Sequence, residues 1–281
     1  MRRIAHLSDL HFGRDRPELL QPLLDAVNAL RPDLVVMSGD LTQRARDDQF
    51  RAAAAFIKAV EAPVLSVPGN HDVPLDNLIW RLFLPWRRYK QWISPDLEPQ
   101  FADAEIVVIG VNTVNRFVWQ QGWFRSRALR RVSAAFAGGA HRRIHIVVAH
   151  HPLEHPDGEP KSLMRGAARG LRTLSDNGTD LVLSGHLHSW RAELFANVAG
   201  LASALQVHAG TSLSDRMRGE VNDFNLLEVE RSKIIVHRYG FADGADSFAL
   251  AASVTFIAGP EGWTRSDVRS VQATAASPEP I

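Results

Sequence analysis

Five short polar motifs, each placed just after a short apolar run, limit how this chain can fold. In chain order the motifs are Asp9-Leu10-His11, Gly39-Asp40, Gly69-Asn70-His71-Asp72, His150-His151-Pro152 and Gly185-His186-Leu187-His188. Strand ends in an open α/β sheet converge on one crevice, so side chains far apart in sequence can meet there. The motifs supply Asp, Asn and His donors, which suit Mn, Fe, Zn or similar divalent ions. The pattern predicts a metal site at the C-terminal ends of several strands.

The first 190 residues alternate short apolar runs with longer stretches of helical character. Continuous apolar runs predict strands that are covered on both faces, and their alternation with helices predicts βαβ units. The predicted strands are Ile4–Leu7, Leu34–Met37, Val64–Val67, Ile106–Val111, Ile144–Ala149 and Leu181–Leu183. The predicted helices are Leu19–Leu30, Asp47–Val60, Arg127–Phe136 and Ser162–Asn177.

After residue 190, short strands separated by turns replace this alternation. The predicted strands are Leu194–Ala196, Ala204–His208, Phe224–Glu230, Ile234–Tyr239 and Phe248–Ile257. We expect them to form a second, antiparallel sheet packed in the same domain, which gives a helix-covered β-sandwich. Residues 1–270 would form this single domain, and the small, polar residues 271–281 would form a flexible C-terminal tail.

Composition excludes several classes of protein. Hydrophobic residues make up 45% of the 281 residues, which is enough for a sizeable core. The 32 Lys and Arg against 31 Asp and Glu argue against a general nucleic-acid binder. Without cysteine, a metal must be held by His, Asp, Glu or Asn. Neither a signal peptide nor an apolar run of about 18 residues is evident, so we expect a cytoplasmic protein.

The first motifs have the residue types and spacing of ion ligands. Asp9 and His11 alternate at a strand end, where both side chains can face one ion. The carboxylate of Asp40 could bridge two ions, and Gly39 permits a close backbone approach. The Asn70 carbonyl is a suitable hard ligand, and the adjacent His71 can act as an acid or hydrogen-bond donor. Each motif alone is also common in ordinary turns.

The later motifs supply imidazoles. His150 and His151 point in opposite directions on extended backbone, so only one of them is expected to be a ligand, with the other in a supporting role. His186 and His188 can present one imidazole to each of two ions. Together the five motifs predict a metal site, because every motif falls at a predicted strand end.

The order of the five motifs resembles that of the calcineurin-like metallophosphoesterase superfamily. The stretches His6–His11 and Gly39–Gln43 more specifically resemble bacterial class III cyclic nucleotide phosphodiesterases, as do Ala209–Ser212, Arg218 and Asn222–Asn225. The resemblance covers roughly residues 3–240. It implies an α/β fold with four layers (αββα), in which two mixed β-sheets pack as a sandwich flanked by helices.

The resemblance also implies a centre of two divalent ions, Mn and/or Fe, with Zn, Co or Ni as alternatives. Three side chains would hold the first ion: Asp9, His11 and His188. Three others would hold the second: Asn70, His150 and His186. Asp40 would bridge both ions.

The remaining site residues would act on the substrate. His71 would be catalytic, facing the phosphate or the leaving oxygen, and Asp72 would orient it. Substrate contacts are expected from Asn70, His71, Arg218 and Asn222, with Arg216 and Arg218 either meeting a phosphate or remaining solvated.

The implied activity is phosphodiester hydrolysis by a metal-bridging hydroxide, with 3′,5′-cyclic nucleotides such as cyclic AMP as the favoured substrate. The alternative is a pyrophosphohydrolase or phosphodiesterase acting on a lipid-linked or UDP-linked substrate. A non-catalytic scaffold is disfavoured because every expected ligand position is occupied. A nuclease is disfavoured by the near-zero net charge.

Residues 80–93 stand out by composition. They contain three of the seven Trp and four basic residues, and they lie in an expected helical flap at about 74–100. Three interpretations remain open: a flap packed on the domain, a homodimer interface or substrate lid, and contact with a membrane surface.

Overall fold

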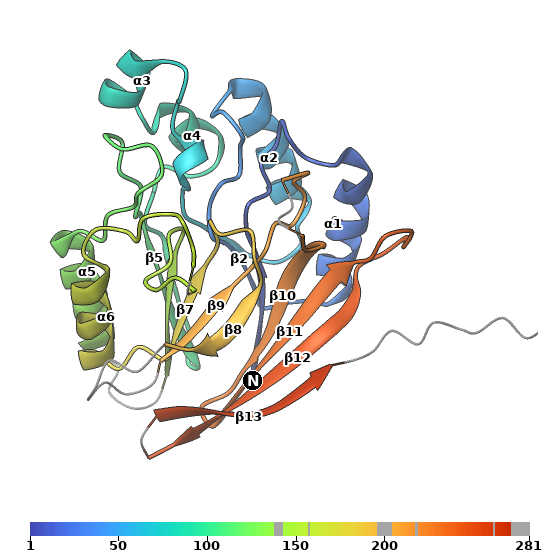
Figure 1. The fold of residues 1–281 in the computed structure, drawn as a ribbon, viewed down its shortest axis with the longest axis vertical. Coiled ribbons are helices and arrows are strands. Elements are labelled where there is room, and N and C mark those ends of the chain that lie inside the picture. The colour runs from blue at the N-terminus through green and yellow to red at the C-terminus, as the bar shows by residue number, and fades with distance from the viewer. Residues whose placement is uncertain (138–142, 157, 196–203, 217–218, 261, 271–281) are drawn as a thin grey trace, which may run out of the picture.

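The computed structural model describes residues 1–281 except 138–142, 157, 196–203, 217–218, 261 and 271–281 (Figure 1). The predicted tail 271–281 therefore lies outside the described residues, as does Ala196 at the end of one predicted strand. Among the described residues, no helix has the length and apolar character needed to cross a membrane.

The strands form two mixed sheets, as predicted. The first sheet has seven strands in the order β13 (Gly262–Ser270), β12 (Ala249–Gly259), β11 (Lys233–Phe241), β10 (Asn222–Val229), β1 (Arg2–Leu7), β2 (Leu34–Met37) and β3 (Val64–Ser66). The second has six, in the order β4 (Gln100–Ala102), β5 (Ile106–Val111), β6 (Ile144–Ala149), β7 (Leu181–Ser184), β9 (Leu205–His208) and β8 (Arg191–Leu194).

Parallel strands occupy one part of each sheet. β1, β2 and β3 are parallel to one another in the first sheet, and β5, β6, β7 and β9 are parallel in the second. Their C-terminal ends lie at the same end of the sandwich (Figure 1). This is the arrangement that brings the polar motifs together.

Side-chain alternation along the strands builds the layers. In β2, Leu34 and Val36 face the core between the sheets, whereas Val35 and Met37 face outward. The outward face of the first sheet packs against α1 (Leu20–Ala29) and α2 (Asp47–Ala59). The outward face of the second packs against α5 (Ser126–Ala137) and α6 (Ala167–Asp176). The four-layer αββα prediction is confirmed (Figure 1).

Two details of the strands differ from the sequence predictions. The late strands do not form a sheet of their own: β8 and β9 complete the second sheet, and β10–β13 extend the first. The predicted strand Leu194–Ala196 is wrong, because β8 spans Arg191–Leu194. The flap contains two short helices, α3 (Leu78–Phe83) and α4 (Arg87–Trp92), interrupted near Pro85.

Candidate metal centre

The predicted donors lie on loops that directly follow five parallel strands. Asp9 follows β1, Asp40 follows β2, and Asn70 lies in the single turn η2 (Asn70–Asp72) after β3. His150 and His186 follow β6 and β7 of the other sheet. The site therefore spans both sheets, and all seven predicted ligands come together there.

The loops are held in a tight, left-handed conformation. Five of the seven donors have positive φ angles, between 49° and 70°: Asp9, His11, Asp40, His186 and His188. The first two loops run side by side, because the Asp9 amide donates to the Gly39 carbonyl at 3.1 Å and the His11 amide to the Asp40 carbonyl at 3.0 Å. A non-glycine residue in this region is uncommon, and such strain concentrates at functional sites.

Glycines in the motifs make room for the donors. At Gly185 a Cβ atom would collide with Ser8 Oγ and Asp9 Oδ2, and at Gly69 it would collide with Asp40. Gly39 has φ of 100° and lies against the His150 ring. These three positions exclude a side chain, which explains the Gly in each motif.

A first group of donors is formed by Asp9, His11 and His188. Asp9 Oδ1 lies 3.2 Å from His188 Nε2 and 3.5 Å from His11 Nε2, and the two nitrogens are 3.2 Å apart. Ligands about 2.1 Å from one ion are separated by about 3.0–3.5 Å in tetrahedral or octahedral geometry. The three distances fit one ion.

A second group surrounds His150 Nε2. Asn70 Oδ1 lies 3.1 Å from this nitrogen, and His186 Nδ1 and Asp40 Oδ2 each lie 3.3 Å from it. Asp40 Oδ2 is also 3.8 Å from His11 Nε2, which belongs to the first group. One carboxylate oxygen thus lies between two donor groups, as a bridging ligand would.

The hydrogen bonds of two His rings are compatible with donors that face a cation. The Nδ1 atoms of His150 and His188 donate to the carbonyls of Ser38 and Arg216, each at 2.9 Å. A neutral ring held in this way points the lone pair of Nε2 at its neighbours. Each of these lone pairs faces a carboxylate oxygen at 3.2–3.3 Å. Such an arrangement is repulsive unless a proton on Nε2 or a bound cation supplies positive charge between the atoms.

The pKa shifts of the site also indicate that positive charge is favoured among the donors. Burial alone would lower the pKa of His150, but the charges of Asp40 and Asp9 raise it to about 9. Burial alone would raise the pKa of Asp9 and Asp40, but the surrounding His rings hold both pKa values well below the ordinary range. Burial lowers the pKa of His11 to about 4. The site thus favours ionised carboxylates around bound positive charge.

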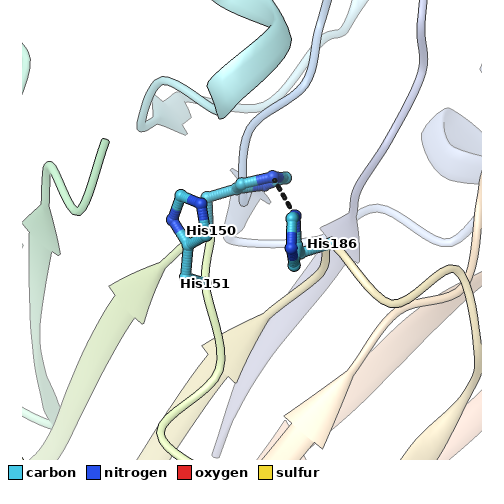
Figure 2. A group of neighbouring side chains, drawn as sticks. All are labelled: His150, His151 and His186. Carbon is cyan, nitrogen blue, oxygen red and sulfur yellow. Dashed lines mark hydrogen bonds between the residues drawn. The ribbon is translucent and has the colours of Figure 1, made fainter. Parts of the chain in front are cut away.

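His151 lies beside the second group but is held differently. Its Nδ1 is 2.8 Å from Thr113 Oγ1, and its ring centroid is 4.6 Å from that of His186 (Figure 2). His150, His151 and His186 can present nitrogens within 4.8 Å of one another. His150 Nε2 is the nitrogen that lies among the donors of the second group, and the His151 ring lies beside that group.

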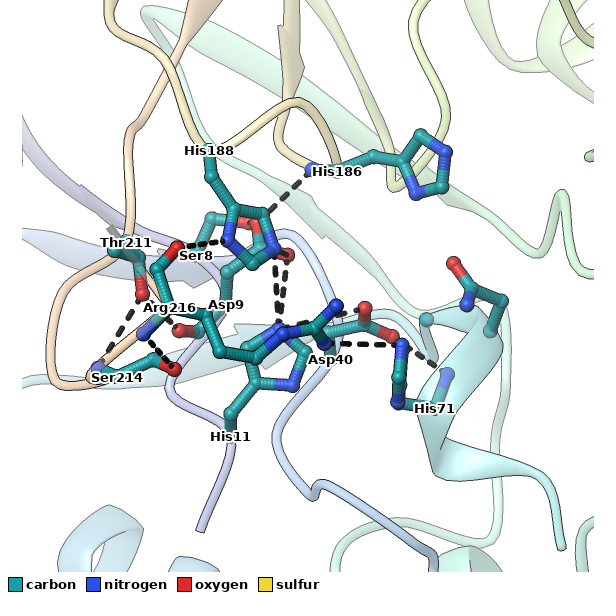
Figure 3. A network of polar contacts seen from close by, with 12 residues as sticks. Ser8, Asp9, His11, Asp40, His71, His186, His188, Thr211, Ser214 and Arg216 are labelled. Atoms are coloured by element: carbon teal, nitrogen blue, oxygen red, sulfur yellow. Dashed lines mark hydrogen bonds and ion pairs between the residues drawn. The ribbon is translucent and has the colours of Figure 1, made fainter. Parts of the chain in front are cut away.

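His71 lies at the centre without joining either group. Its Nδ1 donates to the Gln43 carbonyl at 2.9 Å, and its Nε2 accepts from Arg216 Nη1 at 3.2 Å (Figure 3). Burial lowers its pKa, whereas the Asp40 charge and the Gln43 carbonyl raise it. His71 is therefore placed to face a substrate from its Nε2 side.

Asp72 differs from the sequence expectation, because its carboxylate contacts backbone amides and not the His71 ring. Oδ1 accepts from the amide and hydroxyl of Thr42 at 2.8 and 2.9 Å, and Oδ2 accepts from the amides of Gly69 and Leu41 at 2.9 and 3.2 Å. Burial and the Asp40 charge raise the pKa of Asp72 to about 7. Asp72 joins the loop after β2 to the loop after β3.

The predicted substrate residues have mixed placements. Asn70 and His71 lie at the donor groups. Asn222 is fully buried, and its amide nitrogen donates to the carbonyls of Thr211 and Ser214, so it holds the 211–214 loop. Arg218 lies outside the described residues. Arg216, left open by the sequence, is the arginine that reaches His71 (Figure 3).

A profile of the calcineurin-like phosphoesterase family matches residues 2–190. A probable cyclic nucleotide phosphodiesterase of Pseudoalteromonas sp. is 27% identical over 203 residues, which cover 66% of this chain and 71% of that protein. The glycerophosphodiester phosphodiesterase of Enterobacter lignolyticus is 36% identical over 80 residues, or 25% of this chain and 29% of that protein.

A purple acid phosphatase from yellow lupin seeds shares the fold. Its TM-score is 0.60 at 15% identity, and the aligned part covers 90% of this chain and 53% of the phosphatase. The family profile spans more than half of the chain, including all seven donors. The chain therefore belongs to the calcineurin-like phosphoesterase family and is a metal-dependent phosphoesterase.

Proposed function

We propose that this protein is a binuclear metal-dependent phosphodiesterase. The observation that supports the proposal best is Asp40 Oδ2, placed between two donor groups that each have the spacing of one ion. Asp9, His11 and His188 would hold the first ion, and Asn70, His150 and His186 the second. When bound, the two ions would neutralise charge on the phosphate oxygens and lower the pKa of an attacking water.

The protein's own groups would complete the reaction around the phosphate. Asn70 and His71 would contact a non-bridging oxygen. Arg216 would exchange its bond to His71 for the phosphate, because a guanidinium matches a phosphate with two parallel hydrogen bonds. In its imidazolium form, His71 would pass the Nε2 proton to the leaving alkoxide as the phosphorus–oxygen bond breaks.

We propose 3′,5′-cyclic nucleotides, such as cyclic AMP, as the first substrate candidate. The support is the similarity to a probable cyclic nucleotide phosphodiesterase along two thirds of the chain. A second candidate is a lipid-linked or UDP-linked phosphoester. The exposed apolar side chains of α3 favour it, since Ile79 and Phe83 are 71% and 76% exposed.

The proposal is tested with Mn-reconstituted protein on bis(p-nitrophenyl) phosphate, p-nitrophenyl phosphate, cyclic AMP and a UDP-linked acyl sugar. We expect both diesters to be hydrolysed well above the monoester. Cyclic AMP turnover above that of the activated diester would support the first candidate, whereas preference for the acyl sugar would select the second. Hydrolysis of the monoester alone would refute phosphodiesterase function.

A matched pair of variants ties the activity to the site. The Asp40→Asn variant should lose ion binding and nearly all turnover. Its amide offers one oxygen and no negative charge at the position where two ions would share a carboxylate. Asp48→Asn changes an exposed carboxylate at the start of α2 and should leave turnover intact. Full activity of Asp40→Asn with two ions bound would refute the bridging role.

A further inference from the structure

Exposed apolar side chains are concentrated in one part of the described structure. Among the described residues, twelve large apolar side chains are exposed, and nine of them belong to three neighbouring segments. We call these nine the apolar rim: Leu78, Ile79, Leu82, Phe83, Leu84, Phe117, Trp119, Trp123 and Leu163. A soluble surface rarely gathers apolar groups in this way unless they meet a partner.

Buried contacts fix the segments of the apolar rim to one another. Arg81 of α3 is 4% exposed and donates to the carbonyls of Pro74, Arg116 and Val118 at 2.8–3.3 Å. It thereby joins α3 to the loop that carries Phe117 and Trp119. Farther along, Gln121 donates to the Leu163 carbonyl at 3.0 Å. The rim is therefore one connected surface.

The apolar rim borders the metal centre. The chain passes from Asn70 through η2 to α3 within eight residues. On the other side, the Trp123 amide donates to the Thr113 carbonyl at 2.7 Å, and the hydroxyl of Thr113 contacts His151. A surface that covers the rim would therefore lie on segments that connect directly to the metal centre.

Two of the three rim segments carry charge of one sign, whereas the third, around Leu163, contains both acidic and basic residues. Residues 77–95 contain four basic and no acidic residues, and residues 112–127 contain three basic and no acidic residues. Arg88 is neutralised by Asp47 at 2.8 Å, but Arg87 and Lys90 are exposed. The nearest preceding acid, Asp76, pairs with Arg46 at 3.7 Å. Such a surface complements anionic lipid headgroups.

A second copy of the chain is the rival occupant. A two-fold contact would place one basic surface against its twin, and the two segments supply no acid to neutralise it. Apolar side chains ringed by arginine, lysine and tryptophan are the composition of interfacial segments. The charge of these two segments therefore favours a lipid surface over a second copy.

We propose that the apolar rim docks on an anionic phospholipid surface, with Ile79, Phe83 and Phe117 inserted among the acyl chains. The metal centre then opens beside the headgroups. The docking stands independently of catalysis. Its consequence for the substrate rests on the proposed function: a phosphoester displayed at a lipid surface would reach the ions without leaving that surface.

The test is co-sedimentation of the Mn-loaded protein with vesicles of phosphatidylcholine, with and without phosphatidylglycerol. We expect binding to the anionic vesicles, weak binding to pure phosphatidylcholine, and a decrease at high salt. The triple variant I79S/F83S/F117S should bind at least about tenfold more weakly. The control L250S/I257S alters two exposed apolar side chains of β12 and should bind normally.

The outcomes separate docking from activity. Both variants should hydrolyse soluble bis(p-nitrophenyl) phosphate like the parent, which shows that they are folded. Absence of binding to anionic vesicles, or equal binding by the triple variant, would overturn the proposal. The proposal would also be overturned if the parent protein and the control formed dimers in analytical ultracentrifugation and the triple variant did not. A further outcome is that the parent protein hydrolyses none of the phosphoesters while the triple variant alone loses vesicle binding. In that case the proposed function fails and the docking stands.

Discussion

Replacing Asp72 with Asn should loosen the metal centre without altering the chemistry of His71. The carboxylate accepts four hydrogen bonds, two at each oxygen, from the loops that carry Asp40 and Asn70. At pH 8, above its pKa of about 7, it is ionised. An Asn side chain keeps one oxygen, so two buried donors would face an NH2 group. At about 1–3 kcal/mol for each unsatisfied donor, the free energy of unfolding should fall by about 3 kcal/mol.

Urea unfolding at pH 8 measures this loss, and calorimetric titration of metal-free protein measures ion binding. We expect Asp72→Asn to weaken binding at both positions, since the loop after β2 supplies the shared carboxylate. Asp76→Asn is the matched control, because its exposed ion pair with Arg46 contributes less than about 1 kcal/mol. If Asp72→Asn retains full stability and slows only diesters with poor leaving groups, then Asp72 acts through His71 and this reasoning is wrong.

Three further changes probe other contacts of the site. Gly185→Ala places a methyl group against Asp9 and should weaken binding of the first ion at least about tenfold. Gly259→Ala is the control, because a methyl group fits there without a clash. Equal calorimetric affinities of the two variants would contradict this prediction. Arg216→Gln should raise KM for diesters about tenfold with a smaller change in kcat, and an unchanged KM would exclude phosphate contact. Burial, with the His208 charge, lowers the pKa of His6 from 6.5 to about 3, so its contribution to stability is complete above pH 6.5 and is lost as pH falls toward 3. In metal-free protein, His6→Asn should reduce the slope of unfolding free energy against pH by about 1.4 kcal/mol per unit between pH 6 and 4, and an unchanged slope would exclude His6 as a source of acid sensitivity.

The central strands were predictable because each is a short, largely apolar run, and most of them end directly before a polar motif. β2, β5 and β6 have the predicted bounds. The pairing of the late strands was not predictable, since an alternating strand such as β10 carries no mark of its neighbour. β4 has two of its three residues exposed, and β13 is largely polar, so neither produces an apolar run.

In the candidate site, residue types and their order could be read from the sequence, but hydrogen-bond partners could not. The sequence motif places Asp72 next to His71, yet the turn η2 directs the carboxylate toward the loop after β2. The partner of His71 is the Gln43 carbonyl, a backbone group without a sequence signal. Arg216 and Arg218 are equivalent in sequence, and only the fold shows that Arg216 contacts His71.

The left-handed backbone of Asp9, His11, Asp40, His186 and His188 has a consequence for metal choice. Each such residue raises the free energy of the fold by about 1–2 kcal/mol, which the packed sheets must offset. Loops held in this way are preformed, so ions of slightly different radius meet the same fixed donors. If these loops keep their shape when an ion binds, discrimination among Mn, Fe, Zn, Co and Ni would fall to their supply in the cell and to their exchange rates.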